Sequence, residues 1–233
     1  VYDELVVDPC FAEWADFLLS LWADDHVRSV LDVCCGTGLM TGELRGRGLT
    51  AVGLDASPEM LALARRRRGP DVLLLEAVLP ALPLPGGFDA AVSTFDGLNY
   101  LSTDDLRASL AAVAGQLRPG GWFVFDLHTD ATLAFARANP VITGEQDGAA
   151  FTLTTGIDEG ARTIVTTIDL ASPDPADSFV EHHRQVIHDD ATVRSALADA
   201  GFDIVAVLDE YTPAPATSTT LRATWVARLP GSA

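Results

Sequence analysis

Two glycines and one carboxylate are the first residues whose types and spacing point to chemistry. A hydrophobic run from Val30 to Cys34 reads as a buried strand and leads into Gly36 and Gly38. Glycines in such a turn let a ligand approach backbone N–H groups that side chains would otherwise shield. The next apolar run ends in Asp55, where an acidic side chain can bind a ribose diol. The pattern predicts a site for a nucleotide-type cofactor.

The glycine spacing separates two classes of cofactor. Dinucleotide sites use G-x-G-x-x-G, whose third glycine lets the helix pack closely, whereas here the third glycine is Gly42, one place late. Preceded by Leu31-Asp32-Val33, this run resembles the first motif of the class I S-adenosylmethionine (SAM) dependent methyltransferases. Residues 52–61 resemble that family's second motif, and residues 117–125 resemble its turn and fifth strand. One departure is Cys34, where the family usually has glycine or alanine, and another is Glu76, where it more often has aspartate.

The resemblance implies that SAM is the cofactor and S-adenosylhomocysteine (SAH) the product. Asp55 would bind the ribose hydroxyls of SAM. The methionine part would face one acidic side chain and the backbone of the glycine turn, a set that comprises Asp32, Cys34, Cys35, Gly36 and Gly38.

The resemblance also assigns residues around the adenine and at the entrance. They are Ala56 and Met60 flanking the adenine, Glu76 and Ala77 at its amino edge, and Thr94 and Phe95 on the near side. Tyr2 begins a Tyr-Asp-x-Leu segment that resembles the family's N-terminal lid. From there it would contact the carboxylate of the cofactor or the acceptor.

Three further segments supply candidates for the acceptor side. They contribute Asp96, Asn99 and Tyr100 after the fourth strand, His128 after the fifth, and His182 and His183 on a later strand. His128 is the candidate catalytic residue, because the pKa of an imidazole suits proton removal near neutral pH. Adjacent residues on a strand point to opposite faces, so at most one of His182 and His183 looks into a cleft.

The chemistry expected of these residues is methyl transfer to an N or O atom of a small-molecule metabolite. A sulfonium is an activated leaving group, so positioning supplies much of the acceleration and a general base is optional. Adjacent histidines are poorly spaced for metal binding and the chain has no His-Glu-x-x-His sequence, so we predict no metal site. The arrangement is similar to bacterial small-molecule methyltransferases, including those that methylate amino sugars and other natural-product intermediates.

Composition limits the partners. The formal charge of −18 comes from 33 acidic and 15 basic residues, which argues against a nucleic-acid substrate. All the basic residues are arginines, so a lysine Schiff base and a Gly-Lys-Ser/Thr phosphate loop are excluded. No apolar run has the roughly 20 residues that a membrane span needs. We expect a cytoplasmic protein, monomeric or homodimeric, with a small-molecule acceptor and no membrane partner.

The elements that must position these residues alternate along the chain. Residues 1–26 are predicted to form an N-terminal helical cap, and residues 1–233 a single methyltransferase domain. The predicted fold class is α/β: a doubly wound, Rossmann-like, seven-stranded sheet, mostly parallel with an antiparallel last strand. Between residues 141 and 188 the sequence is rich in Thr and alternates apolar with polar residues. This pattern predicts a β-hairpin at 151–168 and allows a third strand at 179–188. This antiparallel β insertion after strand five would stand over the cofactor edge as a lid.

Two other functions remain open. One is an NAD(P)-dependent oxidoreductase on a Rossmann-like sheet, against which the late third glycine and the absence of a Tyr-x-x-x-Lys pair both count. The other is a non-catalytic SAM-binding module, against which Gly36, Gly38 and Asp55 argue because the motif is intact.

Overall fold

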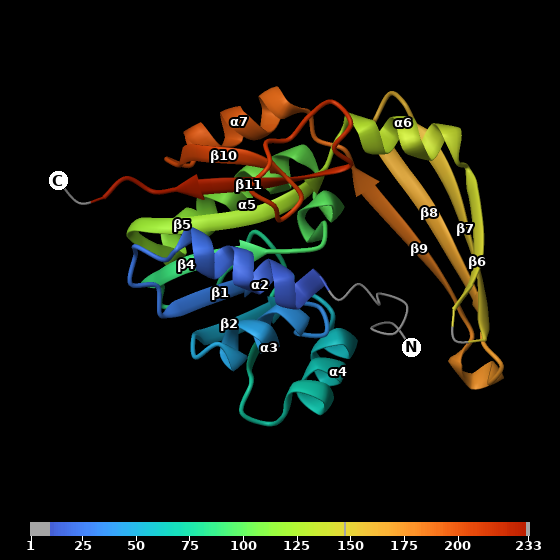
Figure 1. Cartoon of the computed structure of the whole chain (residues 1–233), viewed down its shortest axis with the longest axis horizontal. Helices are drawn as coiled ribbons and strands as arrows, with labels where there is room; N and C mark the ends of the chain where they lie inside the picture. The colour runs from blue at the N-terminus through green and yellow to red at the C-terminus, as the bar shows by residue number, and fades with distance from the viewer. Residues whose placement is uncertain (1–9, 147, 232–233) are drawn as a thin grey trace.

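A seven-stranded sheet forms the body of the protein in the computed structural model, which describes residues 10–146 and 148–231 (Figure 1). In spatial order its strands are β10 (Asp203–Asp209), β11 (Arg222–Arg228), β5 (Leu117–His128), β4 (Phe88–Ser93), β1 (Ser29–Val33), β2 (Thr50–Asp55) and β3 (Leu73–Glu76). β11 pairs antiparallel with β5 and with β10, and the remaining pairs are parallel. The predicted fold class is confirmed.

Helices cover both faces of this sheet. On one face, α2 (Cys10–Leu21) and α3 (Leu39–Gly46) bury Trp14, Leu18 and Leu44 against strands β1, β4 and β5. On the other face lie α5 (Thr103–Gln116) and α7 (Asp190–Asp199). α4 (Pro58–Arg68) packs on β2 and β3. None of the described helices has the length and apolarity needed to cross a membrane.

Side-chain caps fix where two of these helices begin. The hydroxyl of Ser57 accepts a hydrogen bond from the backbone N–H of Met60, so α4 starts directly after β2. The hydroxyl of Ser102 accepts from the N–H of Asp105 and starts α5. Because these caps satisfy N–H groups that have no partner inside the helix, the loops that precede them are held close to the carboxyl ends of the strands.

A second, antiparallel sheet is inserted after β5. Its strands, in spatial order, are β6 (Val141–Gln146), β7 (Ala149–Asp158), β8 (Thr163–Ala171) and β9 (Phe179–Val186). The helix α6 (Asp130–Ala138) joins it to the body, and the short 3-10 helix η2 (Pro175–Asp177) lies at its far end (Figure 1). The sequence predicted β7, β8 and β9 within this insertion; β6 and α6 were not predicted. The sheet stands beyond the carboxyl ends of β1, β2 and β4 (Figure 1).

Candidate active site

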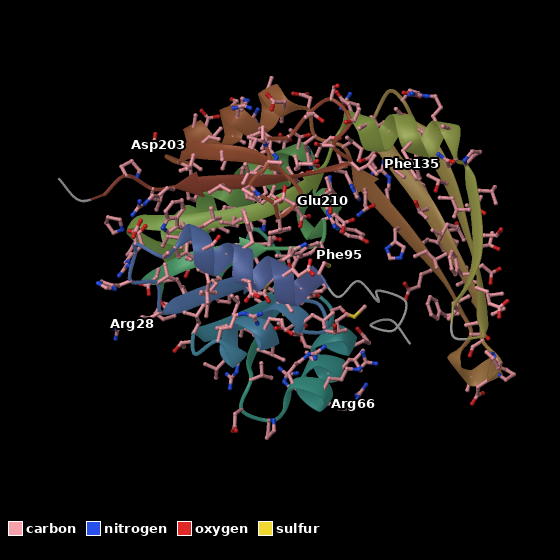
Figure 2. The ribbon with its side chains drawn as sticks, viewed as in Figure 1. Arg28, Arg66, Phe95, Phe135, Asp203 and Glu210 are labelled. Carbon is pink, nitrogen blue, oxygen red and sulfur yellow. The ribbon has the colours of Figure 1, made fainter. Side chains whose placement is uncertain are left out.

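A cavity of about 980 Å³ lies between the carboxyl ends of the body strands and the second sheet. Figure 2 shows Phe95 on the side of the body that faces the second sheet, with Arg28 at the opposite ends of the strands. Of the residues predicted from the sequence, those that line this cavity are Cys34, Gly36, Asp55, Ala56, Met60, Ala77, Phe95, Asp96, Tyr100, His182 and His183. Residues from four loops and one later strand are thus brought together.

The glycine turn after β1 is held in an unusual backbone conformation. Cys34, Gly36 and Gly38 all have positive φ angles, of 60°, 52° and 71°. The carboxylate of Asp55 fixes the turn, because Oδ2 accepts the N–H of Gly36 at 2.8 Å and Oδ1 accepts that of Ser57 at 2.9 Å. The glycine turn after β1 and the turn that leads into α4 are therefore held by the same side chain.

Asp32 lies beneath the turn as a buried carboxyl group, with an exposed fraction of 1%. Its Oδ2 accepts a hydrogen bond from Thr41 Oγ1 at 2.5 Å, and its Oδ1 has no partner. Burial raises the pKa of Asp32 to about 7. An unpartnered buried carboxylate oxygen is costly, so this position suits a ligand that brings a cation.

The two neighbouring cysteines are structural in this setting. Burial raises the pKa of the Cys34 thiol to about 12 and raises that of Cys35 further. Cys35 Sγ fills space next to Gly53, where a Cβ would lie only 2.8 Å from it. Cys34 Cβ similarly fills the space beside Gly97, where a Cβ would lie 2.7 Å away. Neither thiol is a nucleophile near neutral pH.

Several predicted residues lie beside the cavity rather than on its wall. Gly38 is the N-cap of α3, Glu76 ends β3 in an exposed position, and Thr94 is buried just after β4. Asn99 is fully buried, where its Nδ2 donates to the carbonyl of Val186 and its Oδ1 accepts the N–H of His128. Tyr2 lies outside the described residues.

The turn after β4 carries two consecutive residues with positive φ, Phe95 at 65° and Asp96 at 54°. Neither is glycine, so this backbone conformation is strained. The buried carboxylate of Asp126 holds the turn by accepting the N–H of Phe95 at 2.7 Å and that of Asp96 at 2.5 Å. Tyr211 donates its hydroxyl to the same carboxylate at 2.8 Å. Burial raises the pKa of Asp126, although the neighbouring Arg222 acts in the opposite direction.

Arg222 completes this cluster from β11. Its guanidinium lies 4.9 Å from the ring centre of Phe95 and 4.8 Å from that of Trp14. Burial lowers the pKa of Arg222, but Asp126 and Asp96 outweigh it, so the net shift is upward and the group stays charged. Sequence patterns predicted neither the bonds by which Asp126 holds this turn nor any role for Arg222. A carboxylate inside the otherwise apolar strand segment 122–127 was the available signal.

His128 and Asp96 form a hydrogen-bonded pair, in which Asp96 lines the acceptor end of the cavity and His128 lies behind it. His128 Nε2 lies 2.9 Å from Asp96 Oδ2, and Gln185 Nε2 donates to the same oxygen. The Nδ1 atom of His128 is buried without a partner. Gln185 comes from β9, so one carboxylate connects the body to the second sheet.

A second hydrogen bond also connects the body to β9 of the second sheet. Tyr100 Oη lies 2.6 Å from His183 Nδ1, and His183 Nε2 lies 3.3 Å from Glu181 Oε2. Glu181 and His183 are partly buried on the cavity side of β9, whereas His182 between them is exposed and hydrogen-bonded to Thr167. All three nevertheless contribute atoms to the cavity wall.

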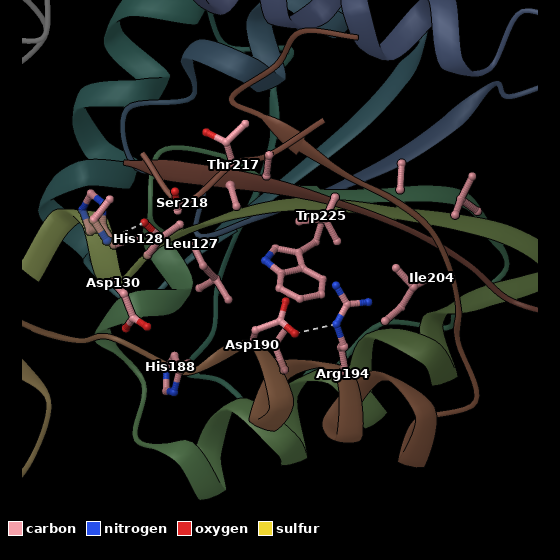
Figure 3. A pocket seen from close by; sticks show the side chains of 18 residues that line it. Leu127, His128, Asp130, His188, Asp190, Arg194, Ile204, Thr217, Ser218 and Trp225 are labelled. Carbon is pink, nitrogen blue, oxygen red and sulfur yellow. Dashed lines mark hydrogen bonds and ion pairs between the residues drawn. The ribbon is translucent and has the colours of Figure 1, made fainter. Parts of the chain in front are cut away.

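A smaller cavity of about 560 Å³ lies behind His128 (Figure 3). Its walls come mainly from β10, β11 and α7, with Trp225 beside the Asp190–Arg194 ion pair of 2.6 Å. Among the predicted site residues that the structure describes, His128 alone lines this cavity, and it does not line the larger one. The glycine turn and Asp55 belong to the larger cavity, which is therefore the candidate active site.

Within residues 10–146 and 148–231, no three His, Cys, Asp or Glu side chains gather as they would around a metal ion.

Comparison with known proteins supports this assignment. Residues 30–121 match the family model described as a methyltransferase domain. The chain is 26% identical over 218 residues to "Putative methyltransferase YqeM" of Bacillus subtilis (strain 168), covering 91% of this chain and 87% of that protein. The chain contains a methyltransferase domain and is a SAM-dependent methyltransferase.

Two further proteins resemble this methyltransferase, one in fold and one over part of its sequence. A SAM-dependent methyltransferase from Clostridium acetobutylicum ATCC 824 has the same fold, with a TM-score of 0.88 at 24% identity over 99% of this chain and 96% of that one. The dTDP-3-amino-3,4,6-trideoxy-alpha-D-glucopyranose N,N-dimethyltransferase of Streptomyces venezuelae is 37% identical over 99 residues, covering 42% of this chain and 41% of that protein.

The residues present fit SAM as the cofactor of the methyltransferase. SAM carries an ammonium and a sulfonium, and the unpartnered Oδ1 of Asp32 is a buried acceptor close to the glycine turn. The open backbone at Gly36, where a Cβ would meet nothing within 4 Å, leaves room for a ligand against the turn.

Proposed function

We propose that this methyltransferase moves the methyl group of SAM to an N or O atom of a small-molecule metabolite. The observation that carries the proposal is the meeting of two sets of groups in one cavity. The glycine turn with Asp55 lies at one end, and Asp96, in contact with His128, lies at the other. A cofactor at the first end would present its methyl group toward an acceptor at the second.

In this proposal the cofactor is held by charge and by shape. Asp32 would face the ammonium of the methionine part, and Asp55 the ribose hydroxyls. The backbone of Cys34, Cys35, Gly36 and Gly38 would line the methionine part. The remaining predicted cofactor residues would surround the adenine and the entrance: Ala56, Met60, Glu76, Ala77, Thr94 and Phe95, with Tyr2 from the N-terminal segment.

The acceptor side orients a nucleophile and removes a proton. Asp96, Tyr100, His182 and His183 would surround the acceptor, and the second sheet would act as the lid that excludes water. Asn99, predicted from the sequence to bind the acceptor, would instead hold the backbone of His128 from behind the cavity wall. When bound, SAM supplies an electrophilic methyl group on a sulfonium, so alignment of the acceptor is the main requirement. The pair of His128 and Asp96, with Asp96 on the cavity wall and His128 behind it, would take the proton of the nucleophile.

The relatives favour a small molecule as acceptor. One relative is named for N,N-dimethylation of a dTDP-linked amino sugar, and the described cavity has the size of a cofactor and small-ligand site rather than that of a nucleic-acid surface. The formal charge of −18 agrees with this, because it would repel a phosphate backbone.

The role of His128 is tested by replacing it with alanine. SAH formation is measured with a panel of small amines and alcohols, and SAH binding is measured by calorimetry. We expect the His128→Ala variant to lose about 10²-fold to 10⁴-fold in turnover, as for other general bases, with SAH affinity unchanged. His26→Ala, which alters an exposed histidine at the other end of β1, is the matched control. Full turnover in His128→Ala would remove His128 from the mechanism.

A further inference from the structure

The charges of the cavity wall are all of one sign. The chain has no lysine, and its 15 arginines all lie among the described residues, since residues 1–9, 147, 232 and 233 contain none. No arginine lines the cavity, whereas the carboxylates of Asp55, Asp96 and Glu181 do. The arginine beside the acceptor end, Arg222, has a side chain only 11% exposed and lies behind Phe95, against Asp126.

The far half of the second sheet gives the cavity an apolar wall. Phe151, Leu153, Ile168 and Phe179 line the cavity from three neighbouring strands, and we call these four residues the apolar wall. Register places them in two adjacent rows, since Phe151 and Phe179 both pair with Leu170, and Leu153 pairs with Ile168. The ring of Phe151 lies over Gly144, where any Cβ would be within 2.4 Å of it. The sequence therefore keeps this ring on the cavity side.

Polar groups begin within the second of these rows, that of Leu153 and Ile168, and continue toward the body. Glu181 pairs with Ile168 at the edge of the apolar wall, and His183 follows it, bonded to Tyr100. Gln185 and Asp96 complete this end. An acceptor that spans the space would thus have one polar end, near His128, and one apolar end, beneath the far half of the second sheet.

We propose that the acceptor is an amine carried on an apolar alkyl or aryl body, without a phosphate or carboxylate. This inference rests on the proposed function and names its substrate class. A cationic amine is attracted to a wall of carboxylates, whereas a diphosphate would be taken from water with no arginine or lysine to pair with. The methyltransferase therefore differs in acceptor from its relative named for a dTDP-linked amino sugar.

The reaction with such an acceptor balances without any further reagent. The ammonium gives one proton to the hydrogen-bonded pair of His128 and Asp96, of which Asp96 lines the cavity, and becomes a neutral amine. Its lone pair forms the bond to the methyl carbon, and the electron pair of the carbon–sulfur bond stays on sulfur, which yields SAH. The methylated amine carries the positive charge away, and the proton held by the Asp96–His128 pair passes to solvent.

The test compares amines that differ only in the features named here. Hexylamine, butylamine and 6-aminohexyl phosphate are titrated into the full chain saturated with SAH, and their methylation is followed with SAM. The work is done at about pH 8, where imidazoles are mostly neutral. We expect the two added methylenes of hexylamine to strengthen binding by about fourfold each, and the phosphate to weaken it by at least about tenfold.

A pair of variants on β7 locates the apolar end. Leu153→Arg places a cation on the apolar wall and should reverse the preference, so that the aminohexyl phosphate binds more tightly than hexylamine. Thr154→Arg adds the same charge to the adjacent, exposed position, and should leave the preference as it was. SAH titration and thermal unfolding of both variants show that they are folded, and the wild-type comparison decides the proposal if Leu153→Arg does not fold.

The two proposals fail in different ways. Equal or tighter binding of the phosphate compound by the wild-type chain, no dependence on chain length, or no binding of any amine to the SAH complex would overturn the acceptor class. If SAH itself does not bind, or no amine or alcohol is methylated by an SAM-bound chain, the proposed function fails.

Discussion

Single carboxylates at the ends of strands hold the backbone of the candidate site. Asp55 accepts two N–H groups at the glycine turn, and Asp126 accepts two at the strained turn that carries Asp96. Asp89 plays the same part at the opposite edge of the sheet, accepting the N–H groups of Arg28 and Ser29. The same kind of carboxylate–backbone contact therefore stabilises the fold at the amino ends of the strands and holds the candidate site at their carboxyl ends.

Replacement of Asp126 separates these two uses. Asp126→Asn retains the shape but presents an amide N–H to one of the two backbone N–H groups, so the turn at Asp96 should relax. We expect a loss of stability of about 1–3 kcal/mol and a fall in turnover of at least about tenfold, with SAH affinity changed far less. Asp89→Asn is the matched control, because it should lose stability but retain turnover. Parallel losses of turnover in the two variants would contradict this account.

The raised pKa of Asp32 predicts a pH dependence. The folded protein holds the Asp32 proton up to about pH 7, whereas the unfolded chain releases it near 3.8. The free energy of unfolding of the ligand-free protein should therefore fall as the pH rises from about 4 to about 7. Chemical denaturation across this range, on wild type and Asp32→Asn, measures the difference.

Cofactor binding should release this proton. A cationic ligand favours the ionised form of Asp32, so SAM affinity should rise with pH up to about 7. Calorimetry at about pH 6 in two buffers of different ionisation enthalpy counts the protons released. Equal proton release by wild type and Asp32→Asn would show that another group is responsible.

At the scale of elements, patterns in the sequence predicted those parts of the fold that have a strong local signal. The alternation of apolar strands with helices predicted the body, because the central strands β1, β4 and β5 are largely buried and the helices bury one face against them. The helix α6 was missed because its nine residues bury only Leu133 and Ala136. Those two side chains pack on Ile164 and Ile157 of the second sheet, so tertiary contact rather than periodicity stabilises the helix.

The site was predictable to a similar extent. The residues of the family's motifs could be predicted as site residues from the sequence, and many of them line the candidate cavity. The clamp by Asp126, the position of Arg222 and the bond from Gln185 to Asp96 could not be predicted. Each joins segments far apart in the chain, and neither periodicity nor local spacing carries that information.

The link between the two sheets gives a prediction at this scale. Asn99 is buried between them and bonds both Val186 and the backbone of His128. Asn99→Ala leaves both groups without a partner, which should cost about 1–3 kcal/mol, speed hydrogen exchange in residues 179–186 and lower turnover. Asn139→Ala removes the exposed bond to Phe135 and should do none of these. Unchanged exchange in β9 after Asn99→Ala would show that other contacts hold the second sheet in place.

For the whole molecule, the arrangement is a cavity enclosed by two sheets with different tasks. The body supplies the glycine turn and the carboxylates, and the second sheet supplies the apolar wall and the polar row that faces Asp96. The negative charge spread over the protein favours a cationic cofactor and disfavours anionic ligands at long range. The proposed amine acceptor thus has the same sign of charge as the cofactor.

The most direct test of this account is calorimetric titration of SAH and NADH into the wild-type chain and the Asp55→Ala variant. We predict that the wild-type chain binds SAH but not NADH, and that Asp55→Ala weakens SAH binding by about 1–3 kcal/mol through loss of a charge-assisted bond. Asp71→Ala, at an exposed position before β3, should bind as the wild type does. Binding of NADH in place of SAH, or full SAH affinity in Asp55→Ala, would contradict the placement of the cofactor in this cavity.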